Sequence, residues 1–374
     1  MKPHAIKGPL RLLALAAVAL AASGCERPAE QKAQTGYRGT GMIDYQNPHL
    51  VAAKKAANVV PPAQPPAPAV GPPASQVYQN VQVLGGLSVP QFTRLMLAIT
   101  AWVSPEQGCN YCHEGNNLAS DAVYTKVVTR SMLRMTQHIN SQWQAHVGQT
   151  GVTCWTCHRG KPVPSEIWFN HVDPPRARLA GNNARQNKAD ENSIGMTSLP
   201  QDIYETFLLG DANIRVTGTE ALPYGNRSSI KQAEWTFALM IHMSEGLGVN
   251  CTYCHNSRAF NSWATSNPAR VTAWHGIRMA RAINNDFLQP LQPVYPANRL
   301  GPSGDAPKLN CATCHQGVFK PLYGAPMLAD YTELAAPVPA PPPPESAPSE
   351  PPVEAPADAP TSAQSQSSVG APAG

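Results

Sequence analysis

The sequence is poor in charged residues and contains no basic run. Charged side chains make up 14% of the chain, against roughly one quarter in a typical globular protein. Either partners or cofactors cover part of the surface, or uncharged Pro/Ala-rich segments dilute the charge, and composition gives both explanations equal weight. Because Lys and Arg are not interleaved with aromatic residues along any stripe, the sequence excludes nucleic-acid binding.

Proline, by contrast, is abundant and unevenly placed. The 39 proline residues cluster from Pro61 to Pro73 and from Pro337 to the C-terminus, where Ala, Ser and Glu accompany them. Such segments hold too few large apolar side chains to form a packed core. Both are predicted to be solvated coil, and the stretch from residue 322 to 374 is predicted to be a disordered tail.

The N-terminus has the layout of a secretory signal. Basic residues precede an apolar run from Leu12 to Ala22, which is shorter than the roughly 20 residues that span a bilayer. Residues 23–25 are Ser-Gly-Cys, and with Ala22 they resemble a bacterial lipoprotein cleavage site in which leucine is usual at the first place. We expect residues 1–24 to be removed and Cys25 to be lipidated; the alternative is ordinary cleavage with an incidental cysteine.

The remaining cysteines carry the strongest signal. Apart from Cys25, all of them fall in four Cys-x-x-Cys-His motifs: Cys109/Cys112/His113, Cys154/Cys157/His158, Cys251/Cys254/His255 and Cys311/Cys314/His315. Two thiols one helical turn apart can add to the two vinyl groups of a haem, and the adjacent histidine then binds the iron. Disulfides, thioredoxin-like motifs and zinc pairs do not explain a histidine after every second cysteine. The motifs therefore predict four covalently bound haem c groups.

The motifs form two pairs, and the chain between them repeats. Arg134-Met135 and Ile139-Asn140 recur as Arg278-Met279 and Ile283-Asn284 at the same spacing. The period of roughly 140 residues fits a duplicated two-haem module. After the signal we therefore expect an anchor and linker at 25–75, a first dihaem module at 76–165, a connecting segment at 166–225, a second dihaem module at 226–321, and the tail at 322–374.

Sixth iron ligands are expected from helices that pass over the haem faces. Helices are predicted at 91–103, opened by Ser88-Val89-Pro90, and at 230–243, before the first motif of each pair. Thioether sulfur is a soft ligand that raises the haem potential, although a methionine at helical spacing is more often core filler. The methionines in suitable places are Met96, Met132, Met135, Met240, Met243 and Met279.

One of the four haems lacks a methionine at the repeated place. Where the first half has Met132, the second half has Gly276. The missing ligand must then come from elsewhere in the chain, and His138 and His146 are both open candidates for it. Either histidine is equally consistent with a hydrogen-bonded structural residue.

Taken together, these motifs resemble the tetrahaem cytochrome subunit of the photosynthetic reaction centre of purple bacteria. The resemblance includes Gly36–Met42, the four haem motifs and Trp274–Met279, and it extends to about Pro321. It implies a mainly α fold with extensive irregular chain, a multihaem cytochrome c of two pseudo-repeated dihaem modules. It also implies a sixth ligand for each haem in motif order, namely Met96, Met132, Met240 and His146.

The resemblance further implies a function and partners. The protein would pass electrons from a soluble periplasmic donor, a small cytochrome c or a high-potential iron–sulfur protein, to the photo-oxidised bacteriochlorophyll of the reaction centre. It would dock on the L and M subunits at the periplasmic face of the inner photosynthetic membrane, where two or more acyl chains at Cys25 anchor it. A free-standing periplasmic tetrahaem carrier is the nearest alternative.

Charged residues near the motifs suggest two further roles. Lys126 and Arg270 occupy equivalent places in the repeat and could pair with haem propionates or be solvated charges. Glu106 and Glu114 near the first motif could steer a basic carrier. Because every haem has two candidate ligands, no iron is left open for a substrate. We therefore expect an electron carrier and not an enzyme such as a multihaem oxidoreductase.

Overall fold

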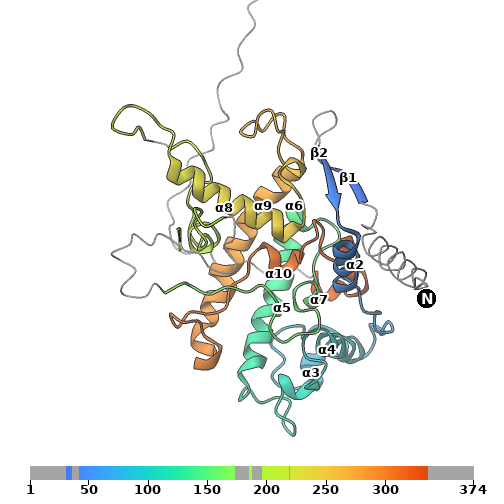
Figure 1. The fold of residues 1–374 in the computed structure, drawn as a ribbon. Coiled ribbons are helices and arrows are strands. Elements are labelled where there is room, and N and C mark those ends of the chain that lie inside the picture. Colours follow the sequence, from blue (N-terminus) through green and yellow to red (C-terminus); the bar gives the residue numbers. More distant parts are fainter. Residues whose placement is uncertain (1–30, 36–41, 173–184, 188–195, 219, 336–374) are drawn as a thin grey trace, which may run out of the picture. The chain divides into compact units, whose positions relative to one another are not determined.

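The computed structural model describes residues 31–35, 42–172, 185–187, 196–218 and 220–335 (Figure 1). The predicted signal peptide, Cys25 and the chain beyond residue 335 lie outside these residues. Among the described residues, no helix is both long and apolar enough to cross a membrane.

Helices and irregular chain dominate the described residues, as the sequence predicts. The strands β1 (Gln31–Thr35) and β2 (Met42–Gln46) form one antiparallel pair in which Gln31 faces Gln46. The α-helices are α2 (Pro48–Ala57), α3 (Ala74–Val77), α4 (Val89–Val103), α5 (Tyr124–Gln142), α6 (Gln144–Val147), α7 (Cys154–His158), α8 (Ile230–Leu247), α9 (Ala269–Ile283) and α10 (Cys311–His315). Short helical turns are η1 (Gly108–Tyr111), η3 (Glu205–Leu209), η4 (Cys251–Tyr253), η5 (Asn284–Leu288), η6 (Gln289–Val294), η7 (Ala297–Arg299), η8 (Pro321–Gly324), η9 (Met327–Asp330) and η10 (Thr332–Leu334).

The helices predicted before the first and third motifs are confirmed as α4 and α8. Ser88 caps α4 in a capping box: its hydroxyl accepts from the Gln91 amide at 3.4 Å, and the Gln91 side chain accepts from the Ser88 amide at 3.2 Å. Ser229 caps α8 through its hydroxyl alone, which accepts from the Gln232 amide at 3.4 Å. These caps satisfy amide groups that the first turn of a helix leaves without partners.

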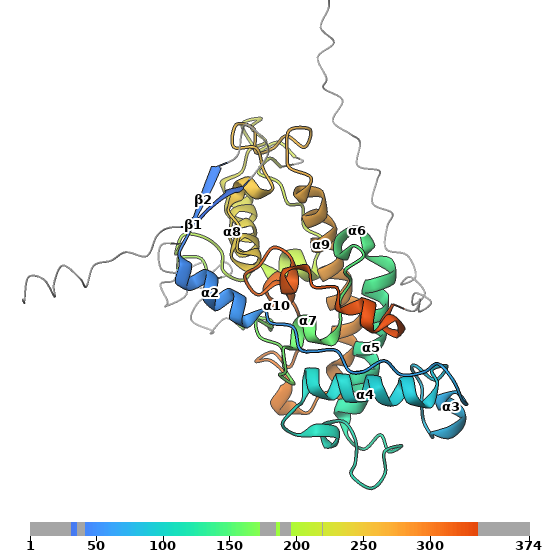
Figure 2. The same ribbon diagram turned by 90° about the vertical axis from the view of Figure 1, so that its right-hand side faces the viewer.

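The described elements follow the same order in both halves of the chain. A long helix (α4 or α8) leads to a short turn (η1 or η4), then to a second long helix (α5 or α9) and later to a one-turn helix (α7 or α10); α6 precedes α7, whereas η5, η6 and η7 precede α10. In Figures 1 and 2, α7 and α10 lie between the α3/α4 end and the α8/α9 end. The one-turn helices contact each other, and each also packs on the long helix of its own half.

Residues 322–335 belong to the core, so the prediction that a disordered tail begins at residue 322 is wrong for this segment. The buried side chains of this segment pack against α5 and against α4, including Trp102 of α4. These side chains are Leu322, Met327, Tyr331 and Leu334. The Trp102 and Tyr331 rings meet edge to face with centroids 4.6 Å apart. These apolar residues are spaced without helical or strand periodicity in short turns, so the sequence pattern gave no sign of their burial.

The Pro-rich segment at 59–73, which we call the strap, is bound to the protein rather than free. Arg94 of α4 donates from Nε to Pro65 O at 2.8 Å and from Nη2 to Gln64 O at 3.0 Å. Its guanidinium lies 4.2 Å from the Tyr331 ring centre, and the Tyr331 hydroxyl accepts from the Gln64 amide at 2.9 Å. The strap has no regular structure, as predicted, but solvated coil is the wrong description because side chains bind its carbonyl groups.

Candidate functional site

Each Cys-x-x-Cys-His motif forms a single helical turn. The first and third motifs coincide with η1 and η4, where the amides of His113 and His255 each donate to the carbonyl of the first cysteine at 3.0 Å. The second and fourth motifs are α7 and α10, each opened by a capping box. The turn therefore places both thiols and the histidine of every motif close together, as predicted from the spacing.

The imidazoles of the motif histidines share one hydrogen-bonding arrangement. In each of them Nδ1 lies 2.9–3.0 Å from a backbone carbonyl: Leu118 for His113, Lys161 for His158, Phe260 for His255 and Val318 for His315. A carbonyl can only accept, so Nδ1 carries the proton. The tautomer leaves the Nε2 lone pair available for a metal, as is usual for metal-binding histidines.

Burial favours the neutral imidazole in three of the motif histidines and in His146. It lowers the pKa of His146, His158 and His255, and it lowers the pKa of His315 to about 4. Only a neutral imidazole has a lone pair to donate to iron. The protein therefore presents ligands that need no deprotonation at neutral pH.

His146, predicted as the sixth ligand at the fourth motif, lies opposite His315. The two ring centroids are 6.0 Å apart, and His146 Nδ1 lies 2.9 Å from Thr272 O. Two imidazoles on opposite sides of one metal ion have ring centres about 6 Å apart, given metal–nitrogen bonds of about 2 Å. The separation of the two rings is therefore compatible with one metal ion between them.

Gly276 makes the approach of His146 possible. A Cβ atom at residue 276 would lie 2.5 Å from His146 Cε1 and 2.8 Å from His146 Nδ1. Gly276 stands where the first half of the chain has Met132. The glycine therefore supplies no thioether ligand, and its lack of a side chain leaves room for the His146 imidazole.

His138, the other open candidate, has a different arrangement. Its Nε2 accepts a hydrogen bond from Trp143 Nε1 at 3.2 Å, and its ring packs 5.2 Å from Phe287. The nitrogen that would bind iron is therefore already engaged. The geometry favours His146 over His138.

The second and fourth motifs meet at the contact of α7 with α10. Arg159 donates from Nη2 to Cys314 O at 3.4 Å, and Gln316, in the equivalent place, donates to Cys157 O at 3.3 Å. The structure joins the sulfurs of Cys157 and Cys314 as a disulfide, with Cα atoms 4.5 Å apart. A sulfur in a disulfide cannot also form a thioether to haem, so the two bonding states exclude each other.

The repeated Ile-Asn pairs have a structural role that sequence reasoning missed. Asn140 donates to Val152 O at 3.0 Å and accepts from the Val152 amide at 2.7 Å, just before the second motif. Asn284 donates to Leu309 O and accepts from the Leu309 amide, both at 2.9 Å, just before the fourth motif. The repetition was visible in the sequence, but the partners are fixed only by the tertiary fold.

A largely apolar cavity adjoins the second motif. Its walls include Cys154, Cys157 and His158 on one side and Met132 and Met135 of α5 on another. Met132 and Met135, the two methionines of α5 that could be the sixth ligand, thus line the same cavity. The other candidates, Met96, Met240, Met243 and Met279, are partly buried against apolar clusters.

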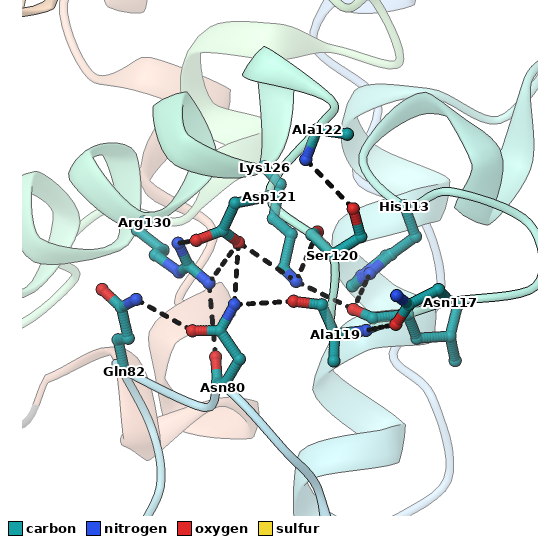
Figure 3. Close-up of polar contacts among 11 residues, drawn as sticks. Asn80, Gln82, His113, Asn117, Ala119, Ser120, Asp121, Ala122, Lys126 and Arg130 are labelled. Atoms are coloured by element: carbon teal, nitrogen blue, oxygen red, sulfur yellow. Dashed lines mark hydrogen bonds and ion pairs between the residues drawn. The ribbon is translucent and has the colours of Figure 1, made fainter.

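Lys126 and Arg270 bind the loops that follow the first and third motifs, and Figure 3 shows the contacts of Lys126. Lys126 Nζ donates to Leu118 O at 2.8 Å and Ser120 O at 2.9 Å, and Arg270 Nη1 donates to Ser262 O at 2.9 Å. Pairing of Lys126 or Arg270 with a haem propionate stays a prediction. Glu106 and Glu114 are exposed, as a role in steering a partner requires.

Helical Cys-x-x-Cys-His turns whose histidines donate from Nδ1 to a backbone carbonyl define the class: this is a c-type cytochrome. A family model described as "Photosynthetic reaction centre cytochrome C subunit" matches residues 26–335. The chain therefore belongs to the family of photosynthetic reaction centre cytochrome c subunits.

Several relatives carry the name photosynthetic reaction center cytochrome c subunit. The protein of Rubrivivax gelatinosus is 56% identical over 88% of this chain and 89% of its own. That of Thermochromatium tepidum is 50% identical over 87% of this chain and 81% of its own. Cytochrome c-554 of Chloroflexus aurantiacus is more distant, at 28% identity over 65% of this chain and 69% of its own.

Proposed function

We propose that this chain is the tetrahaem electron-transfer subunit of a photosynthetic reaction centre. It would accept electrons from a soluble periplasmic donor and re-reduce the photo-oxidised bacteriochlorophyll. The observation that carries the proposal is the pairing of His146 with His315 at a spacing that fits one iron, in a chain with four haem-attachment motifs. Family membership supports the electron-transfer role.

Four haems in two dihaem modules form the finer part of the proposal. The repeated order of elements supports it, as do the equivalent contacts of Asn140 and Asn284. The reciprocal bonds of Arg159 and Gln316 also fit two modules that face each other at α7 and α10. We assign Cys157 and Cys314 to haem attachment in the mature protein, because a disulfide would leave their motif partners Cys154 and Cys311 unused.

The axial ligands would be the four motif histidines together with Met96, Met132, Met240 and His146. The bound haems would supply one-electron couples. The chain itself holds each proximal imidazole through a carbonyl at Nδ1, favours the neutral form of His158, His255 and His315 by burial, and surrounds the second site with apolar walls. Two protein ligands per iron leave no position for a substrate, which favours a carrier over a multihaem oxidoreductase.

The protein would lie at the periplasmic face of the photosynthetic membrane. Docking on the L and M subunits would combine with an acyl anchor at Cys25. Purification of the complex under mild detergent tests this placement: we expect the chain to co-purify with bacteriochlorophyll and four haems. Four haems in a protein that elutes without bacteriochlorophyll would instead support the free-standing carrier.

A further inference from the structure

The carbonyl of Leu118 serves two donors at once. It lies 3.0 Å from His113 Nδ1 and 2.8 Å from Lys126 Nζ (Figure 3). A carbonyl oxygen has two lone pairs, so it can accept both bonds. Lys126 therefore lies two hydrogen bonds away from the imidazole that would bind the first haem iron.

The Lys126 ammonium is held in place from several sides. Its side chain is only 10% exposed, and it also donates to Ser120 O and lies 3.3 Å from Asp121 Oδ1. Arg130 donates to both oxygens of Asp121 at 2.8 and 2.9 Å and holds the pKa of that carboxyl at about 2. Asp121 is thus ionised at neutral pH and lies between the side chains of Lys126 and Arg130.

The equivalent residue of the second half does not make this contact. Arg270 binds Ser262 O and the Ser266 hydroxyl, whereas His255 Nδ1 lies 2.9 Å from a different carbonyl, that of Phe260. Each motif histidine therefore has a backbone carbonyl of its own as acceptor. Among the described contacts, only the carbonyl bound by His113 also accepts from a cationic side chain. This difference distinguishes two sites that the sequence repeat makes look alike.

We propose that Lys126 is a positioning residue that raises the reduction potential of the haem at the first motif through the Leu118 carbonyl. The inference rests on the proposed attachment of a haem at Cys109 and Cys112. A nearby cation disfavours the ferric state, which carries one more positive charge than the ferrous state. The ammonium also draws electron density from the carbonyl, so His113 keeps more of its Nδ1 proton and donates less charge to iron. Both effects have the same sign.

The test is a redox titration of the holoprotein with Lys126→Gln and Lys126→Met. We expect the potential of the first haem to fall in both, so that its ratio of oxidised to reduced forms at fixed poise rises about tenfold, which is 59 mV for one electron. The glutamine amide can still donate to the Leu118 carbonyl but carries no charge. Lys126→Gln therefore removes the charge but keeps a hydrogen bond that supports the loop. This variant decides the test if Lys126→Met fails to bind haem.

Arg134→Gln is the matched control, since it removes an exposed cation from the same helix α5. We expect no change in any haem with this variant, and unchanged ligation bands in the Lys126 variants. An unchanged first-haem potential in Lys126→Gln, or an equal shift in all haems, would overturn the proposal. The absence of a haem at the first motif of the unsubstituted protein would instead refute the proposed function.

Discussion

Replacement of Gly276 by alanine should prevent His146 from binding the haem iron for which it is the proposed ligand. The new Cβ would stand 2.5 Å from His146 Cε1, 2.8 Å from Nδ1 and 3.1 Å from Nε2, all of which are shorter than normal contact. The imidazole is also tied at Nδ1 to Thr272 O, one turn earlier on α9. The ring cannot move aside without losing this bond.

The size of the effect follows from these contacts. Alanine is favoured over glycine within a helix by about 1 kcal/mol, so the α9 backbone itself gains from the change. Overpacking of this kind costs about 1–3 kcal/mol, and the lost hydrogen bond adds about 1 kcal/mol. Ligation by His146 should thus weaken by about 2–4 kcal/mol, roughly 30- to 1,000-fold.

Carbon monoxide binding to the reduced protein measures the result. With every iron six-coordinate, the unsubstituted protein should bind almost none, whereas Gly276→Ala should bind about one molecule per chain. Gly86→Ala is the control, since a Cβ there meets no atom within 4 Å. A Gly276→Ala protein that still excludes carbon monoxide and keeps all four haem potentials would refute the reasoning.

Three further perturbations have defined outcomes. Asn284→Ala removes the acceptor of the Leu309 amide and the Asn284 donor to the Leu208 carbonyl, whereas Leu309 O keeps its bond from Trp168 Nε1, so the free energy of unfolding in guanidinium should fall by about 2–4 kcal/mol; a change below about 0.5 kcal/mol would contradict this role. Arg94→Ala releases the strap, and limited proteolysis should then cut at residues 59–73; equal cutting before and after substitution would count against the strap contacts. Thiol titration of the denatured mature protein should give the same count with and without reductant, since Cys157 and Cys314 would be haem thioethers; two extra thiols after reduction would establish the disulfide.

The sequence predicted local chemistry well because that chemistry depends on short spacings. The haem motifs fall on single helical turns, and the helices before the first and third motifs begin at serine caps close to the predicted positions. The missing methionine at Gly276 left His146 and His138 equally open. The family resemblance implied His146, and the fold separates the two through the hydrogen bond that His138 accepts from Trp143.

Contacts between distant segments could not be predicted in this way. Arg94 and Tyr331 are 237 residues apart, and their contact orders both the strap and the turns at 322–335. Neither segment has the hydrophobic periodicity from which burial is inferred. Lys126 was noticed as a repeated cation, but its partner, the Leu118 carbonyl, is a backbone group that no side-chain pattern reveals.

Flash-induced absorbance changes in the haem α band, recorded on membranes that contain this protein, test the central claim most directly. If the protein donates electrons to the reaction centre, a haem should be oxidised within microseconds of the flash and re-reduced by the soluble donor. Four intact haems that do not respond to the flash would contradict the account and favour a free-standing carrier.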